Sequence, residues 1–207
     1  MEPFSYAHIK WDDEEKSLLY NVIEPVLTEG EMKLYQKVAD ALIQLVDVGL
    51  TGMKEMSHAM QYLQDKVNKV LKDFGMILTQ GQYVKIMYFI YRNFIGLNEI
   101  DSLMMDPNIE DISCDGVGTP VFVVHRKYGS VKTSVVFDNN DRLREFVIKL
   151  AERSGRYVSY AEPILDGTLP DGSRVSATIA GDVATRGPTF TIRKFGEKPL
   201  SPVEQIL

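Results

Sequence analysis

The pattern of apolar and polar residues changes its period near the middle of the chain. In the first half, apolar residues recur three or four positions apart, which predicts amphipathic helices. The expected helices cover residues 28–49, 55–74 and 79–94. The first and third open with capping boxes, Thr28-x-x-Glu31 and Thr79-x-x-Gln82, whose side chains satisfy free backbone N–H groups. The third helix is apolar on so many sides that we expect it to be central and buried.

The residues before and after these helices predict a hairpin and a domain boundary. Two apolar-rich runs flank a charged turn within residues 4–23, which is typical of a β-hairpin. The segment 98–105 follows the last helix, and Asp106 precedes Pro107, a position that disfavours helical backbone. We therefore expect a hairpin and helical subdomain over residues 1–105.

The second half has the texture of a β-sheet. Short runs rich in β-branched residues, separated by Gly-containing turns, predict an antiparallel meander of three strands. These strands are expected at 109–113, 121–125 and 131–137. A helix should follow, capped near Asn139 and ending at Gly155. The predicted fold class is α+β, with an antiparallel sheet and a helix packed on one face over residues 106–200.

A second hairpin is predicted near the end of this domain. The turn Leu169-Pro-Asp-Gly-Ser173 leads into an alternating run to Ile179, and a second run covers 188–195 after the connection 180–187. Antiparallel pairing of the two runs would place Arg174 and Arg193 at the same end of the sheet.

The last seven residues predict the start of another helix. Ser201-Pro-Val-Glu204 combines an N-cap serine, a proline at the first helical position and a glutamate at the third. Because the sequence stops at Leu207, we expect residues 201–207 to begin a linker helix to a domain that lies outside this sequence. The Gly-x-x-x-x-Gly-Lys-Ser/Thr phosphate-binding motif is absent from the 207 residues.

Composition narrows the classes of protein to consider. The net charge of −6 argues against a general polyanion binder, and 44% apolar residues suffice for a packed core. Neither a membrane-spanning run of about 20 apolar residues nor a signal peptide is evident, so we expect a cytoplasmic protein. Cys114 is expected to be buried, and the three histidines lack the spacing of metal ligands.

Arginine is distributed unevenly along the chain. It is absent before Arg92, and seven of the nine arginines follow residue 138. The planar guanidinium is suited to binding phosphates and carboxylates through two parallel hydrogen bonds. Four of the seven are interpreted as the solvated face of the predicted helix: Arg142, Arg144, Arg153 and Arg156.

Four motifs, in the same order, resemble the N-terminal region of the type II/type IV secretion-superfamily ATPases. They are DPNIEDIS at 106–113, LPDGSRV at 169–175, FTIRKF at 190–195 and SPVEQI at 201–206. The resemblance is strongest to the archaeal members that power archaellum rotation and type IV pilus assembly. Over residues 1–105 it is looser and depends on the helical extension of the archaeal members.

The resemblance implies an N-terminal regulatory and assembly region of a hexameric ATPase. It implies a RecA-like domain outside this sequence that binds most of ATP and Mg²⁺, so this chain alone should lack ATPase activity. It also implies partners: neighbouring subunits, a polytopic membrane platform protein at the cytoplasmic face of the membrane, and accessory motor proteins. Nucleic acid is not an expected partner, because the net charge is acidic and no lysine-rich groove is evident. The matching nucleotide-contacting positions are Arg174 and Arg193, with Arg186 and Lys194 as weaker candidates.

Other interpretations of the same residues remain open from the sequence. Arg174 and Arg193 could instead form surface ion pairs with Glu162, Asp166 or Asp171. A single-stranded nucleic-acid-binding module would use these arginines together with three aromatic residues, Tyr160, Phe190 and Phe195. A hydrolase would use Glu162, Asp166 and Asp171 as paired carboxylates, although acids beside Gly and Pro are typical of turns.

Overall fold

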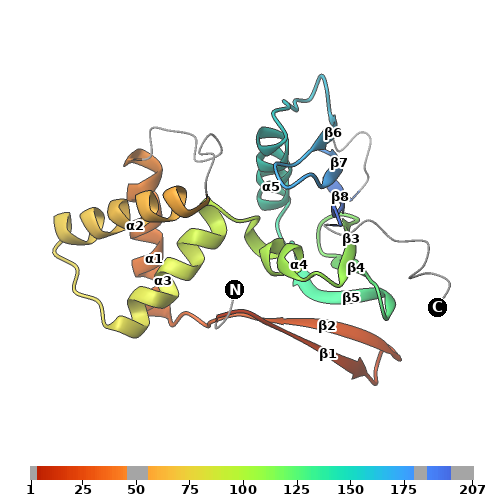
Figure 1. The fold of residues 1–207 in the computed structure, drawn as a ribbon, viewed down its shortest axis with the longest axis horizontal. Helices are drawn as coiled ribbons and strands as arrows, with labels where there is room; N and C mark the ends of the chain where they lie inside the picture. The colour runs from red at the N-terminus through yellow and green to blue at the C-terminus, as the bar shows by residue number, and fades with distance from the viewer. Residues whose placement is uncertain (1–3, 46–55, 180–185, 197–207) are drawn as a thin grey trace. The chain divides into compact units, whose positions relative to one another are not determined.

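A computed structural model describes residues 4–45, 56–179 and 186–196 (Figure 1). The chain divides into two compact units, the first mainly of residues 23–101 and the second of residues 7–22 and 102–207. Helices make up the first unit, and an eight-stranded sheet with a helix makes up the second, which confirms the predicted α+β fold class. The predicted linker helix at 201–207 and the expected helix boundaries at Gly49 and Glu55 lie outside the described residues.

The helical unit contains the three predicted helices. They are α1 (Glu29–Leu45), α2 (Met56–Asp73) and α3 (Gln80–Phe94), and the short η2 (Asn98–Ile100) and α4 (Asp101–Met105) follow them in the chain. Their buried apolar stripes meet in one core, whose members include Val38, Leu42, Leu63, Val67, Ile86 and Ile90. None of the described helices is long and apolar enough to cross a membrane.

Both predicted capping boxes are present in the helical unit. The Glu31 N–H donates to Thr28 Oγ1 at 3.3 Å, and the Thr28 N–H donates to Glu31 Oε2 at 2.8 Å. Thr79 and Gln82 form the same reciprocal pair at the start of α3. These local signals define the helix starts because each capping side chain satisfies a backbone N–H that has no partner within the helix.

The sheet of the second unit is mixed. Its strands are β1 (Tyr6–Asp12), β2 (Ser17–Ile23), β3 (Ile109–Cys114), β4 (Pro120–His125), β5 (Gly129–Val136), β6 (Ile164–Thr168), β7 (Arg174–Thr178) and β8 (Thr189–Arg193). The spatial order is β1-β2-β5-β4-β3-β8-β7-β6. The predicted meander β3-β4-β5 and hairpin β7-β8 are antiparallel, as expected, and β6 is an additional strand that pairs with β7.

The N-terminal hairpin belongs to this sheet, which corrects the expectation that it lies with the helices. Strand β2 runs parallel to β5, with Leu19 opposite Lys132 and Tyr20 opposite Thr133, so the sheet is not purely antiparallel. The Val22 N–H also donates to Ser134 Oγ at 2.9 Å. Parallel pairing joins segments more than one hundred residues apart, and no local pattern in either segment indicates it.

A buried hydrogen bond joins the hairpin to the start of β3. The Tyr20 hydroxyl donates to Asp106 Oδ2 at 2.7 Å, and the Tyr20 side chain is only 1% exposed. Burial, followed by the hydrogen bond to Asp106 and its charge, raises the pKa of the Tyr20 hydroxyl. Burial alone would raise the pKa of Asp106, but hydrogen bonds from the Asn108 N–H, Tyr20 and the Asn108 side chain outweigh it and lower that pKa.

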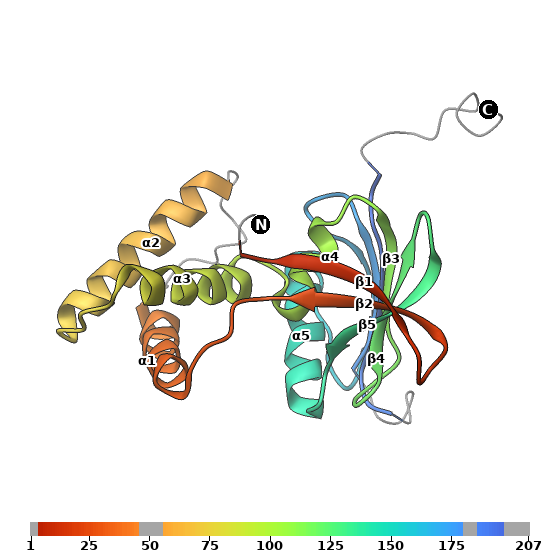
Figure 2. The same ribbon diagram turned by 90° about the horizontal axis from the view of Figure 1, so that it is seen from below.

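Helix α5 (Asn140–Arg153) packs against β7 and β8 and lies on one side of the sheet in Figure 2. Asn139 caps it as predicted, accepting hydrogen bonds from the Asp141 and Arg142 N–H groups. Its apolar side is buried, and Phe146 packs against Phe137 and Phe190 with ring centroids 5.3 and 5.1 Å apart. In β7 and β8, the side chains that alternate with the buried ones lie on the other face of the sheet, which is exposed.

The turn between β6 and β7 is formed by residues 169–173, as its sequence predicts. The Leu169 N–H donates to Ser173 O at 2.8 Å, and the Asp171 carboxylate accepts from the Ser173 N–H and hydroxyl. Gly172 has a φ of +86°, a conformation that side chains rarely tolerate. The turn therefore sets the position at which β7 begins with Arg174.

Candidate functional site

Arg174 and Arg193 are direct cross-strand partners in the β7-β8 hairpin. Both side chains are exposed, and directly opposite residues in an antiparallel pair place their Cβ atoms about 5 Å apart. This register confirms the prediction that the two arginines lie at the same end of the sheet. Two like charges placed opposite each other repel, so each guanidinium is expected to require a nearby anion.

The exposed face of the sheet carries Arg174 and Arg193 in a row of polar residues. Thr168 pairs with Arg174, Arg174 with Arg193, and Arg193 with Asp111 across the strands β6, β7, β8 and β3. Phe190 and Ile192, which alternate with the exposed residues of β8, are buried. Because the side-chain period of a strand is two, the same alternation that fills the core places the arginines on the open face.

Arg193 has an anionic partner within the sheet. Its Nε donates to Asp111 Oδ1 at 2.9 Å, with side-chain exposures of 78% for Arg193 and 25% for Asp111. This hydrogen bond and the charge of Asp111 raise the pKa of Arg193. Asp111 is not one of the carboxylates that the sequence suggested as partners, because it lies 82 residues earlier in the chain. The ion-pair interpretation therefore applies to Arg193, with a different acid.

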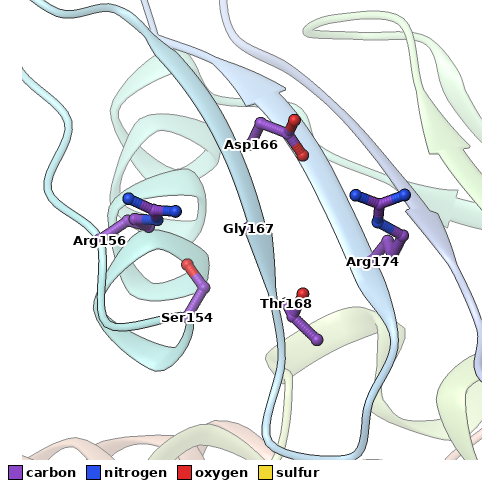
Figure 3. A pocket seen from close by; sticks show the side chains of 6 residues that line it. All are labelled: Ser154, Arg156, Asp166, Gly167, Thr168 and Arg174. Atoms are coloured by element: carbon purple, nitrogen blue, oxygen red, sulfur yellow. The ribbon is translucent and has the colours of Figure 1, made fainter.

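Arg174 remains unpaired within the part of the chain that the structure describes: its guanidinium has no hydrogen bond or ion pair there. It lines a polar pocket of about 260 Å³ together with Ser154, Arg156, Asp166, Gly167 and Thr168 (Figure 3). The pocket lies at the edge strand β6 and the end of α5. No apolar side chain lines it, so the pocket suits a charged or strongly hydrated ligand.

Arg156 is the charged pocket residue that the sequence analysis missed. It was assigned to the solvated face of the helix, but α5 ends at Arg153 and Arg156 lies beyond it. The Arg156 N–H donates to Ala151 O at 2.9 Å, which closes the end of the helix. The Gly155 that predicted the helix end could also have indicated that Arg156 leaves the helical face.

The two weaker site candidates, Arg186 and Lys194, lie elsewhere. The Lys194 ammonium donates to the backbone carbonyls of Leu103 and Asp106, and burial lowers its pKa. Arg186 precedes β8 at the opposite end of the hairpin, where its carbonyl accepts from the Val117 N–H at 3.0 Å. The five residues of β7 span four steps between the two ends of the hairpin, roughly 14 Å of extended chain. The structure thus brings Arg174 and Arg193 together and leaves Arg186 apart.

The structure also shows where the residues of the alternative interpretations lie. Phe190 is 1% exposed and packs in the core, so it cannot stack on a nucleic-acid base, whereas Tyr160 and Phe195 are exposed. The carboxylate of Asp171 is occupied by the turn through Ser173. In the described residues, no group of three or more His, Cys, Asp or Glu side chains could hold a metal ion.

Comparisons with known proteins found archaeal relatives, and no family model matches the chain. The sequence is 41% identical to "Uncharacterized protein MJ1288" of Methanocaldococcus jannaschii over 176 residues, which cover 85% of this chain and 69% of that protein. It is 33% identical to MJ0900 and 32% identical to MJ0781 of the same organism, both also described as uncharacterized. The matches cover 97% and 93% of this chain but only 39% and 26% of those longer proteins.

A similarity to a solved structure was also found. The chain aligns with the VirB11 ATPase from the Brucella suis type IV secretion system, crystallised in complex with sulphate, at a TM-score of 0.42 and 19% identity. The alignment covers 53% of this chain and 33% of that chain.

Proposed function

We propose that this chain, which belongs to the same family as MJ1288 of Methanocaldococcus jannaschii, is the N-terminal module of a hexameric secretion-superfamily ATPase. In this proposal the complete protein powers archaellum rotation, pilus assembly or secretion. A RecA-like domain outside this sequence holds most of the nucleotide, and this module covers the phosphates. The support is the set of motifs at 106–113, 169–175 and 190–195, and the arrangement of their arginines.

The observation that carries the proposal is the cross-strand pair of Arg174 and Arg193 on an exposed sheet face. The triphosphate of ATP is a strong polyanion, and guanidinium groups stabilise the charge that develops during phosphoryl transfer. Arg174 is free to make such a contact, and Arg193 adds positive charge beside it while bonded to Asp111. The proposal assigns Mg²⁺, like most of the nucleotide, to the RecA-like domain.

The proposed partners follow from the same assignment. Neighbouring copies of the complete protein would form the hexamer, and a polytopic membrane protein at the cytoplasmic face of the membrane would receive the force. Most of the length of MJ0900 and MJ0781 lies outside the region matched here, which is compatible with a separate catalytic domain in those relatives.

The direct test is ATP turnover by the complete parent protein. Arg174→Ala and Arg193→Ala should each lower turnover by about tenfold or more, the loss that follows removal of one donor to a developing charge. Arg126→Ala is the matched control. Like Arg193, Arg126 forms an exposed ion pair, with Glu110 at 3.3 Å, but it does not belong to the cross-strand pair of Arg174 and Arg193. Wild-type turnover in both arginine variants, or a parent reading frame without a Walker A motif after Leu207, would reject the proposed function.

A further inference from the structure

We propose that the pocket at the edge strand β6 is a polyphosphate subsite, in which Arg156 and Arg174 bind the phosphate chain of a nucleotide. The nucleotide part of this inference rests on the proposed function, whereas the affinity for a polyphosphate rests on the pocket alone. It assigns a direct phosphate contact to Arg156, a residue outside the motifs that carry the family resemblance.

The charges in the pocket favour an anion. Two guanidinium groups and one carboxylate, that of Asp166, line it, which leaves a net charge of +1. Across the described residues, neither Arg156 nor Arg174 has an ion pair, so Asp166 neutralises neither of them directly. Other arginines of the same unit do have partners: Arg126 pairs with Glu110, Arg144 with Asp141, and Arg193 with Asp111. The two pocket arginines therefore retain their donors for a ligand.

The backbone holds both arginines in position before any ligand binds. The Ser154 N–H donates to Leu150 O at 3.1 Å and the Gly155 N–H to Glu152 O at 3.0 Å, so the chain around Arg156 is closed onto α5. Arg174 is held in the sheet by its pairing with Thr168 and Arg193. Such preorganisation lowers the entropy cost of binding, because only the side chains have to be ordered.

Gly167 allows the end of α5 to approach the edge strand closely. A Cβ atom on Gly167 would lie 2.8 Å from both Cβ and Oγ of Ser154 and 3.5 Å from Arg156 Cγ. Figure 3 shows Arg156 and Ser154 on one side of β6, with Arg174 on the other. A chain of linked phosphates offers one anionic group to each guanidinium, so it is the ligand class that the proposal assigns to the pocket.

The remaining donors and the size of the pocket support the same ligand class. The Ser154 hydroxyl donates to Ala151 O at 2.8 Å and is unavailable, whereas the Thr168 hydroxyl has no hydrogen bond to any described residue. The volume of about 260 Å³ is below the roughly 300–1,000 Å³ typical of sites that enclose a drug-sized molecule. The pocket can thus receive phosphate groups, and the absence of apolar lining side chains leaves no surface for a base.

The test is a calorimetric titration of the 207-residue chain with inorganic tripolyphosphate at low salt, where charged contacts are least screened. Arg156→Gln and Arg174→Gln should each weaken binding by about fivefold or more, through loss of a charge-assisted contact. Asp166→Asn should tighten it, because the net charge of the pocket rises to +2. Arg126→Gln, the matched control, should stay within about twofold of wild type, and thermal unfolding of each variant verifies folding.

The subsite and the proposed function can fail independently, and the measurements distinguish the two cases. No saturable binding by the wild-type chain, wild-type affinity in Arg156→Gln, or equal weakening in Arg126→Gln would reject the subsite. If Arg174→Ala lowers ATP turnover of the parent protein while Arg156→Gln leaves both turnover and tripolyphosphate binding unchanged, the proposed function stands and the subsite fails. If Arg156 is required for tripolyphosphate binding but Arg174→Ala and Arg193→Ala leave turnover unchanged, the polyphosphate subsite stands and its nucleotide role fails with the proposed function.

Discussion

Tyr20→Phe tests how the N-terminal hairpin is attached to the sheet. The substitution keeps the buried ring and removes only the hydroxyl that donates to Asp106 Oδ2 at 2.7 Å. The carboxylate would remain charged and would lose one of its hydrogen-bond donors. Because β2 joins the sheet next to β5, weakening this contact should destabilise the unit in which the arginines lie.

The magnitude follows from the surroundings of Asp106. A hydrogen bond to a charged group contributes about 1.5–3 kcal/mol. Asp106 is only partly buried, and its Oδ1 also accepts from the Asn108 N–H at 2.8 Å and the Asn108 side chain at 3.1 Å. Water and Asn108 therefore compensate in part, and we expect the free energy of unfolding to fall by about 1–2 kcal/mol at pH 7.

The pKa of Asp106 predicts how the cost of Tyr20→Phe changes with pH. The folded pKa of Asp106 is lowered, and the Tyr20 hydrogen bond is one cause. The stability from this group is fully present above the ordinary aspartate pKa of about 3.9 and is lost as pH falls through the lower folded pKa. The difference in unfolding free energy between wild type and Tyr20→Phe should therefore shrink as the pH is lowered below about 4.

Urea denaturation of the 207-residue chain at several pH values measures both effects. Tyr157→Phe is the matched control, since that side chain is 82% exposed, and it should change stability by less than about 0.5 kcal/mol. An equal effect of the two substitutions, or a Tyr20→Phe cost that is the same at pH 7 and at pH 3, would refute the reasoning.

Three further predictions concern residues near the site. Burial lowers the pKa of Lys194, so the unfolded chain binds this proton more tightly than the folded chain does. The wild-type chain should therefore gain stability relative to Lys194→Met as the pH rises toward about 10.4, the ordinary pKa of lysine, and urea denaturation measures this gain. Gly116→Ala places a Cβ 2.6 Å from Arg186 O, whereas the Cβ of Gly118→Ala meets nothing within 4 Å. The first substitution should therefore lower the free energy of unfolding by roughly 2 kcal/mol more than the second in calorimetric melts, and equal losses would contradict the contact. Arg193→Lys should restore only part of the turnover lost in Arg193→Ala of the parent protein, because an ammonium cannot replace the planar fork; full rescue in a phosphate-release assay would show that charge alone suffices.

The sequence by itself determined the features that depend on neighbouring residues. The capping boxes at Thr28 and Thr79, the Asn139 cap and the turn at 169–173 were all predicted because their hydrogen bonds join residues at most four positions apart. The alternation in β7 and β8 likewise predicted that Arg174 and Arg193 lie at the same end of the hairpin, since antiparallel pairing places the start of one strand beside the end of the next.

The tertiary structure alone decided the features that join distant segments. The parallel pairing of β2 with β5, the Asp111 partner of Arg193 and the position of Arg156 beside the edge strand depend on the order of strands in the sheet. Apolar periodicity tells which face of a strand is buried but not which strand lies beside it, because that choice is set by packing over the whole unit. Arg193 therefore has a partner that lies 82 residues away, and the pocket combines a helix end with two strands that no single motif contains.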